Sequence, residues 1–248
     1  MGKSELKLLK NWKRYILEFL MLFLAVFLGF LADGYREKLT EKSREKKYII
    51  SLIQDVESDI AHLDQIISNN TFRKSYLDSL SRSCFAFNKQ DSSLMQLHFY
   101  YPMVLQRPDF FIPNDLTMLQ LKNAGGMRLI KNDQVVKAIL QYDLQKSLAR
   151  NQQEYYENYH NTAINSGLKI FDHQKVRAIW NLRQAKDEVK LSQMNFNLLK
   201  NSEVMIPQFG NEIAMYSGIV GYYNMLLEES KNQANSLITN LKSAYEIE

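Results

Sequence analysis

The sequence predicts an all-α protein in which an N-terminal transmembrane helix continues into a long helix and joins an extramembrane antiparallel helical bundle. Glycine and proline are scarce, with 9 and 4 residues in 248, which leaves little turn chemistry for a sheet of many short strands. No proline precedes Pro102, three fall within residues 102–113, and only Pro207 follows. Because proline interrupts helices, this spacing predicts two long helical halves around one irregular loop.

Residues 15–35, YILEFLMLFLAVFLGFLADGY, are expected to form the transmembrane helix, preceded by a basic segment at 1–14. The fourteen residues from Phe19 to Ala32 carry no polar side chain, and with their flanks they reach the roughly 17 to 25 residues that a bilayer span needs. A cleaved signal peptide, cut near Ala32-Asp33-Gly34, and a buried helix of a soluble protein are the alternatives. The retained anchor is favoured because the helical pattern continues past that cleavage point and apolar residues surround the helix.

Glu18 directly precedes the apolar run and lies within the predicted span. A charge at the bilayer centre costs about 2.5 to 3.5 kcal/mol, and less near the interface. One interpretation is an ion pair with Arg14, four residues earlier, at the level of the lipid headgroups. In the other, Glu18 faces identical residues in an oligomer or an ion path. Ala25 and Gly29 form a small-xxx-small pair that would let two spans approach closely.

Residues 36–248 are expected to form a helical extramembrane domain. Residues 36–47 carry nine charged side chains of both signs, which favours a solvated helical stalk over a lipid-headgroup patch. Apolar residues then recur at alternating steps of four and three, the pattern of a heptad seam that requires a partner helix. They are Ile49, Ile53, Val56, Ile60, Leu63 and Ile67. An unbroken helix from Tyr15 to Ile67 would extend about 80 Å.

The sequence Asn69-Asn70-Thr71 is expected to end this helix, with Thr71 capping a second helix from Phe72 to about Ala86. Ser92 or Ser93 is then expected to cap a short helix.

An irregular loop, YYPMVLQRPDFFIPND, is expected at 100–115. Its prolines oppose a regular helix, and Tyr100, Tyr101, Phe110 and Phe111 make it too apolar to extend freely into water. The loop either packs onto the helices as a lid, which we favour, or presents these four aromatic residues as an interaction surface for a ligand or partner.

Asn114 or Asp115 is expected to start a helix that ends at Gly125-Gly126, where glycine suits a left-handed turn. This glycine pair follows a helix rather than a strand, so a turn is favoured over a phosphate loop. Asn132 is expected to cap the next helix, which runs toward Gly167. Its predicted apolar stripe is Val136, Leu140, Leu144 and Leu148.

Residues 168–210 are less regular, with Asp172 expected to cap a helix and 202–210 expected to be a loop. The final helix has a second heptad seam and is expected to pack antiparallel along the first helix. The seam comprises Ile213, Tyr216, Val220, Tyr223, Leu227, Ser230, Ala234, Leu237, Leu241 and Ala244. The stretch Ile213–Leu227 is too short and too polar for a second span.

Two segments, YILEFLMLFLAVFLGFLADGYRE and LTMLQLKNAGGMRLIKNDQVVKAILQYD, carry a family resemblance. They resemble a group of bacterial single-span membrane proteins classed as a domain of unknown function. The resemblance implies location in the bacterial inner membrane, and it implies no particular activity, substrate or catalytic residue.

No catalytic, cofactor-binding or metal-binding residue is predicted, and we expect that the protein is not an enzyme. The net charge of +4, from 31 basic and 27 acidic residues, does not indicate a nucleic-acid partner. A single cysteine, Cys84, excludes an intramolecular disulfide framework. The four histidines are scattered, and no GxSxG, Walker or GxGxxG motif occurs. A hydrolase based on His160, close to Tyr156 and Tyr159, is the least favoured hypothesis.

The favoured function is therefore a membrane-anchored structural, sensory or interaction module. Its expected partners are the lipid bilayer and either a second copy or another membrane protein. The alternative is an oligomeric ion-conducting or force-transmitting unit that uses Glu18. Five basic residues precede the span and six follow it closely, nearly a tie by the positive-inside rule. We expect a cytoplasmic N-terminus and a periplasmic domain, because a short basic tail is hard to translocate.

Overall fold

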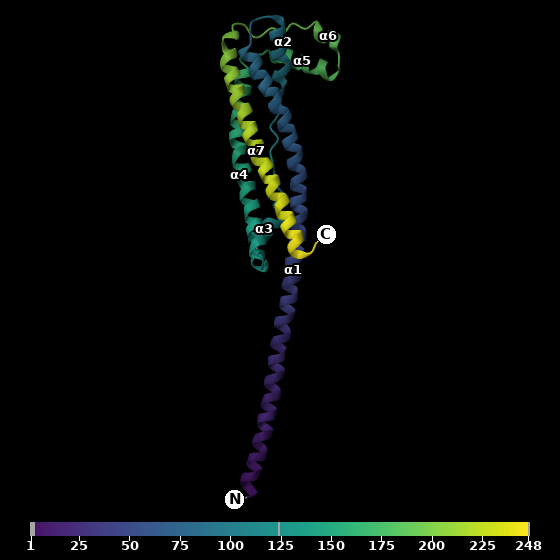
Figure 1. Ribbon diagram of the computed structural model, residues 1–248, viewed down its shortest axis with the longest axis vertical. Coiled ribbons are helices and arrows are strands. Elements are labelled where there is room, and N and C mark those ends of the chain that lie inside the picture. Colours follow the sequence, from purple (N-terminus) through teal and green to yellow (C-terminus); the bar gives the residue numbers. More distant parts are fainter. Residues whose placement is uncertain (1–2, 124, 248) are drawn as a thin grey trace. The chain divides into compact units, whose positions relative to one another are not determined.

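The computed structural model describes residues 3–123 and 125–247, and these residues form helices and connections without a β-strand (Figure 1). The prediction of an all-α fold is confirmed. Met1 and Gly2 of the predicted basic segment, Ala124 and Glu248 lie outside the described residues. The α-helices are α1 (Lys3–Phe85), α2 (Asp91–Tyr100), α3 (Leu116–Asn123), α4 (Asp133–Gly167), α5 (His173–Gln184), α6 (Glu188–Ser192) and α7 (Ile206–Tyr245). Short 3-10 helices occupy Tyr101–Met103, Gly126–Leu129 and Glu203–Met205.

The chain divides into two compact units. The first contains Met1–Leu52 and Thr117–Lys131, and the second contains Ile53–Leu116 and Asn132–Glu248. In the first unit, the backbone N–H of Lys131 donates to Glu45 Oε1 at 3.3 Å. Gly125 turns the chain after α3 with φ of +71°, the left-handed conformation expected for this glycine.

Helix α1 does not end at Asn69-Asn70-Thr71, so the predicted break and the separate helix from Phe72 are wrong. The hydroxyl of Thr71 donates to the Ile67 carbonyl inside the helix at 2.8 Å instead of capping a new one. The Asn70 side chain accepts a hydrogen bond from Tyr156 of α4 at 2.9 Å. The polar side chains that indicated a helix end therefore bond within α1 or to α4, although the buried Nδ2 of Asn70 has no hydrogen-bond partner.

The buried seam of α1 contains polar residues as well as apolar ones. In the second unit it runs at steps of three and four through Val56, Asp59, Leu63, Ile66, Asn70, Arg73, Leu77, Leu80 and Cys84. The prediction is correct at Ile49, Ile53, Val56 and Leu63, which are buried. It is wrong at Ile60 and Ile67, which are only half-buried because Asp59 and Ile66 hold the seam positions.

Helix α7 runs antiparallel to the 53–85 part of α1, as predicted. The Ser81 hydroxyl donates to the Gly210 carbonyl at 2.9 Å. Nearer the other end of α7, Lys231 forms an ion pair with Asp64 at 2.6 Å. Every predicted seam residue of α7 is buried except Ala244, which is exposed.

Helix α4 completes a three-helix bundle with α7 and the 53–85 part of α1 (Figure 1). The predicted stripe of α4 is wrong, since Leu140, Leu144 and Leu148 are exposed. The buried face lies one or two residues earlier than the predicted stripe and includes Val135, Ile139, Tyr142, Lys146, Ala149, Tyr156, His160, Ala163 and Gly167. Apolar periodicity did not predict this buried face, because several of its residues are polar.

The predicted helix starts vary in accuracy. Asn132 caps α4 by accepting from Gln134 N–H at 3.0 Å, and Asp172 caps α5 by accepting from Gln174 N–H at 3.0 Å, both as predicted. Gln90, rather than Ser92 or Ser93, is the N-cap of α2. The predicted loop at 202–210 is wrong, because α7 already begins at Ile206, with Pro207 in its first turn.

A pair of glycines on α7 tests the tight packing between this helix and α1. A Cβ added at Gly210 would lie 2.8 Å from Cys84 Cβ, whereas one added at Gly218 meets nothing within 4 Å. We expect Gly210→Ala to lower the free energy of unfolding by about 1 to 3 kcal/mol through overpacking. Gly218→Ala should raise it by up to about 1 kcal/mol, because alanine favours helix. Urea unfolding followed by circular dichroism measures both, and equal effects would contradict the packing described.

Candidate functional site

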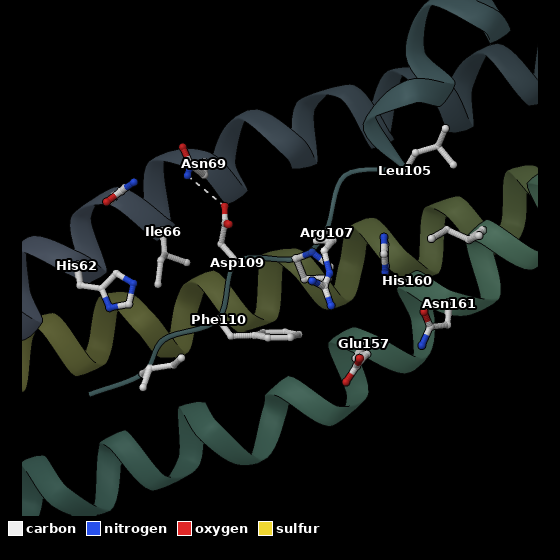
Figure 2. A pocket seen from close by; sticks show the side chains of 14 residues that line it. His62, Ile66, Asn69, Leu105, Arg107, Asp109, Phe110, Glu157, His160 and Asn161 are labelled. Carbon is white, nitrogen blue, oxygen red and sulfur yellow. Dashed lines mark hydrogen bonds between the residues drawn. The ribbon is translucent and has the colours of Figure 1, made fainter. Parts of the chain in front are cut away.

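The segment 104–115, here called the strap, follows the 3-10 turn Tyr101–Met103 and leads into α3. It lies beside α1, α4 and α7 (Figure 2) without forming a helix or strand of its own. Its peptide N–H and C=O groups therefore need partners outside regular secondary structure, because an unpaired buried peptide group costs free energy. Side chains of the three long helices supply these partners.

Two polar seam residues of α1 hold the strap by its backbone. Arg73 donates from Nη1 to the Gln106 carbonyl at 2.8 Å and from Nη2 to the Arg107 carbonyl at 2.7 Å. One turn after Val56, Asp59 accepts from the Asn114 N–H at 2.7 Å and from the Tyr142 hydroxyl at 2.7 Å. Burial raises the pKa of the Asp59 carboxyl, and these two hydrogen bonds oppose the increase.

Helices α4 and α7 hold the middle and the start of the strap. The Phe111 N–H donates to the Tyr223 hydroxyl at 2.9 Å, and Gln153 Nε2 donates to the Phe111 carbonyl at 2.8 Å. His160 Nε2 donates to the Val104 carbonyl at 2.9 Å. The strap is thus bonded along its length by side chains from three helices.

An ionic cluster closes the C-terminal end of the strap. The carboxylate of Asp115 accepts from Lys146 and, at 2.8 Å, from Arg150. The Lys146 side chain is only 4% exposed and also lies 5.0 Å from the ring centre of Tyr142. Burial opposes ionisation of Asp115, but the two cationic donors outweigh it and lower its pKa.

A pocket of about 620 Å³ lies along the strap, between it and the facing sides of α1 and α4 (Figure 2). Four residues of α1 line it at helical spacing: His62, Gln65, Ile66 and Asn69. Four residues of α4 line it with the same spacing: Glu157, His160, Asn161 and Ile164. Leu105, Arg107, Pro108, Asp109, Phe110 and Ile112 of the strap complete the lining.

The pocket combines a partly apolar floor with charged groups. Ile66 is buried, and Phe110 and Ile164 are half-buried. Asp109 accepts from Asn69 Nδ2 at 3.1 Å. Within the described residues, neither the Arg107 guanidinium nor the Glu157 carboxylate forms a hydrogen bond or ion pair with another side chain. These two opposite charges are therefore available to a ligand.

The pocket's histidine is suited to a structural role. His160 is 5% exposed, and burial lowers its pKa, so the ring is neutral near pH 7. Its Nε2 faces a backbone carbonyl rather than a nucleophile. Among the side chains that the structure describes, no group of three or more His, Cys, Asp or Glu residues is arranged to hold a metal ion.

The candidate residues in the apolar part of α1 are all exposed in the single chain. Glu18 pairs with Arg14, with 2.9 Å between Glu18 Oε1 and Arg14 Nε. A Cβ added at Gly29 would meet no atom within 4 Å, and Ala25, one turn earlier, is exposed as well. The role of these residues in oligomerisation stays a prediction.

The four aromatic residues of the predicted interaction loop divide into two pairs. Tyr101 and Phe111 are fully buried in the core, whereas Tyr100 and Phe110 are half-buried. The loop packs onto the helices, which is the first of the two predicted alternatives. Only Phe110 of the four lines the pocket.

Sequence reasoning did not identify Arg73, Asp59, Arg107 or Glu157. A heptad register that continued from Val56 with a step of three, through polar positions, would have placed Asp59 and Arg73 in the seam. No sequence pattern identifies Arg107 and Glu157 as site residues, because they come to the same pocket only when the strap folds against α4.

No family model, curated protein or solved structure matches this chain.

Removing the negative charge of Asp115 should show how much the burial of the Lys146 ammonium destabilises the fold when it has no counter-ion. We expect Asp115→Asn to lower the free energy of unfolding by about 2 kcal/mol or more, because an ammonium is left buried without its counter-ion. Adding Lys146→Met should restore at least half of that loss. The exposed control Arg150→Gln should cost less than about 1 kcal/mol. Urea unfolding measures all four proteins, and a double variant no more stable than Asp115→Asn would contradict this assignment.

The buried histidines predict a loss of stability in mild acid. Burial lowers the pKa of both His98 and His160 below 6.5, so the unfolded chain binds protons more tightly than the folded chain as pH falls through this range. The free energy of unfolding should fall between about pH 7.5 and 5.5 by at most about 1.4 kcal/mol per histidine. His160→Gln keeps an N–H donor and should reduce this pH dependence in urea unfolding. An unchanged pH dependence would contradict the assignment.

Proposed function

We propose that the protein is a single-span membrane-anchored helical module whose extramembrane bundle has a sensory, structural or interaction role. The observation that carries the proposal is the exposure of the apolar part of α1. One stretch of this helix is long and apolar enough to cross a membrane, and none of that stretch is buried within the described chain. Elsewhere, α1, α4 and α7 bury their seams against one another.

The free energy of exposing this segment to water supports a lipid environment. Phe19, Leu22 and Phe30 are 68%, 69% and 75% exposed. Burying one such side chain is worth about 1.5 to 3 kcal/mol, so a run of fourteen apolar residues represents a contribution on the order of 20 kcal/mol. A helix of a soluble protein would bury this surface in its own core, which argues against that alternative.

The continuity of α1 supports retention of the segment. The helix extends from Lys3 to Phe85 without a break at Ala32-Asp33-Gly34, where a signal peptidase would cut. The Arg14–Glu18 ion pair supports Glu18 as a headgroup-level group rather than as part of an ion path. A sensory role for the bundle is supported by the pocket along the strap, since it contains opposite charges with no partner in the described chain. Bacterial inner-membrane location and a periplasmic bundle remain part of this proposal.

Extraction of membranes with alkaline carbonate tests the anchor. The full chain should stay in the membrane pellet, and its mass should include residues 1–35. A Leu22→Arg/Phe27→Arg variant should be released, because each arginine near the bilayer centre costs about 2.5 to 3.5 kcal/mol. The control Leu39→Arg/Ile50→Arg alters exposed apolar residues outside the span and should stay in the pellet. Release of the unaltered protein, or a mature chain starting near residue 35, would refute the proposal.

A further inference from the structure

The pocket along the strap offers one cation and one anion without partners. Arg107 extends from the strap, and Glu157 extends from α4 on the opposite wall (Figure 2). The remaining carboxylate, Asp109, already accepts from Asn69. A simple anion would pair with Arg107 and leave Glu157 unpaired, and a simple cation would do the reverse. A ligand that carries both charges satisfies both side chains.

The Arg107 guanidinium projects from a backbone that is fixed on both sides. Arg73 donates to the carbonyl of Arg107 and to that of the preceding residue, at 2.7 and 2.8 Å. Pro108, the next residue, restricts the chain further. Guanidinium binds carboxylate through two parallel hydrogen bonds, so a fixed starting point for this side chain reduces the entropy lost on binding.

Glu157 lies in the C-terminal half of α4, a helix that packs on α7. Its neighbours on the same face, His160 and Asn161, also line the pocket. His160 is held by the Val104 carbonyl and is uncharged near pH 7, so it adds no competing positive charge. The carboxylate of Glu157 is therefore the acceptor on this wall that suits an ammonium group.

The rest of the lining suits a small polar ligand with a short apolar part. Gln65 and Asn161 offer amide groups that have no hydrogen-bond partner among the described side chains. Ile66, Phe110 and Ile164 provide apolar surface. Such a mixture of a few placed polar groups on apolar walls is typical of small-molecule sites.

We propose that this pocket binds a small zwitterion of the amino-acid class, with its carboxylate on Arg107 and its ammonium on Glu157. The inference deepens the proposed sensory role, on which it rests, by naming the chemical class of the ligand. It uses residues of the second compact unit only.

Isothermal titration calorimetry on the detergent-solubilised full chain tests the proposal. The probes are the twenty standard amino acids, each with its N-acetyl derivative, which lacks the ammonium, and its amide, which lacks the carboxylate. At least one free amino acid should bind, and both of its derivatives should bind at least tenfold more weakly. Absence of binding across the panel would overturn the proposal, as would a derivative that binds as tightly as its parent.

Substitutions then locate the site. Arg107→Gln and Glu157→Gln should each weaken binding of the amino acid at least tenfold, while Glu154→Gln, an exposed change on α4 outside the pocket lining, should leave it unchanged. All three sites are exposed, and circular dichroism melting verifies folding. Unchanged binding in both pocket variants would overturn the assignment.

The test of the ligand site and the test of the membrane anchor can fail independently of each other. A chain that resists carbonate extraction but binds no probe would overturn the ligand site alone. A chain that washes from membranes yet binds an amino acid through Arg107 and Glu157 would overturn the anchor alone.

Discussion

The strap imposes the main physical constraint on this bundle. An irregular segment that packs against helices cannot satisfy its own peptide groups, and each buried group left unpaired costs roughly 1 to 3 kcal/mol. The helices therefore carry polar side chains at positions that a heptad repeat would fill with apolar ones. Arg73 and Asp59 of α1 and His160 of α4 all occupy such positions, and all bond strap peptide groups.

This arrangement links the core to the pocket. The seam residues that satisfy the strap also fix the wall from which Arg107 extends, while the facing turns of α1 and α4 supply the other walls. Tyr223 of α7 is buried and does not line the pocket. Its hydroxyl accepts a hydrogen bond from the Phe111 N–H and so holds the strap in place. Binding residues are often carried by irregular segments that a rigid scaffold holds in position.

The sequence was sufficient for the helical class, the antiparallel final helix and most of its seam. Those features depend on apolar periodicity, proline spacing and cap residues such as Asn132, which are local signals. The continuation of α1 through Asn70 was not predictable locally, because the partner of its side-chain oxygen is the hydroxyl of Tyr156, far away in the sequence. The buried face of α4 was missed for the related reason that Lys146 and His160 occupy it. The apolar row Leu140, Leu144 and Leu148 gave the stronger but incorrect signal.

The candidate pocket could not be predicted at all from the sequence. Its charged residues, Arg107 and Glu157, are ordinary surface residue types, and they share a site only because the strap lies against α4. Aromatic content did indicate that the loop packs against the helices, which holds for Tyr101 and Phe111. Their burial leaves Phe110 as the aromatic contribution of the loop to the pocket.

Amide hydrogen exchange of the strap tests the central claim most directly. The N–H groups of Phe111 and Asn114 donate to Tyr223 and Asp59, so both should exchange as slowly as amides in the middle of α4. In an Asp59→Ala variant, which removes the acceptor, the Asn114 amide should lose more protection than amides in the middle of α7. Exchange of both strap amides at the rate of an unstructured peptide in the unaltered protein would contradict this account of the fold.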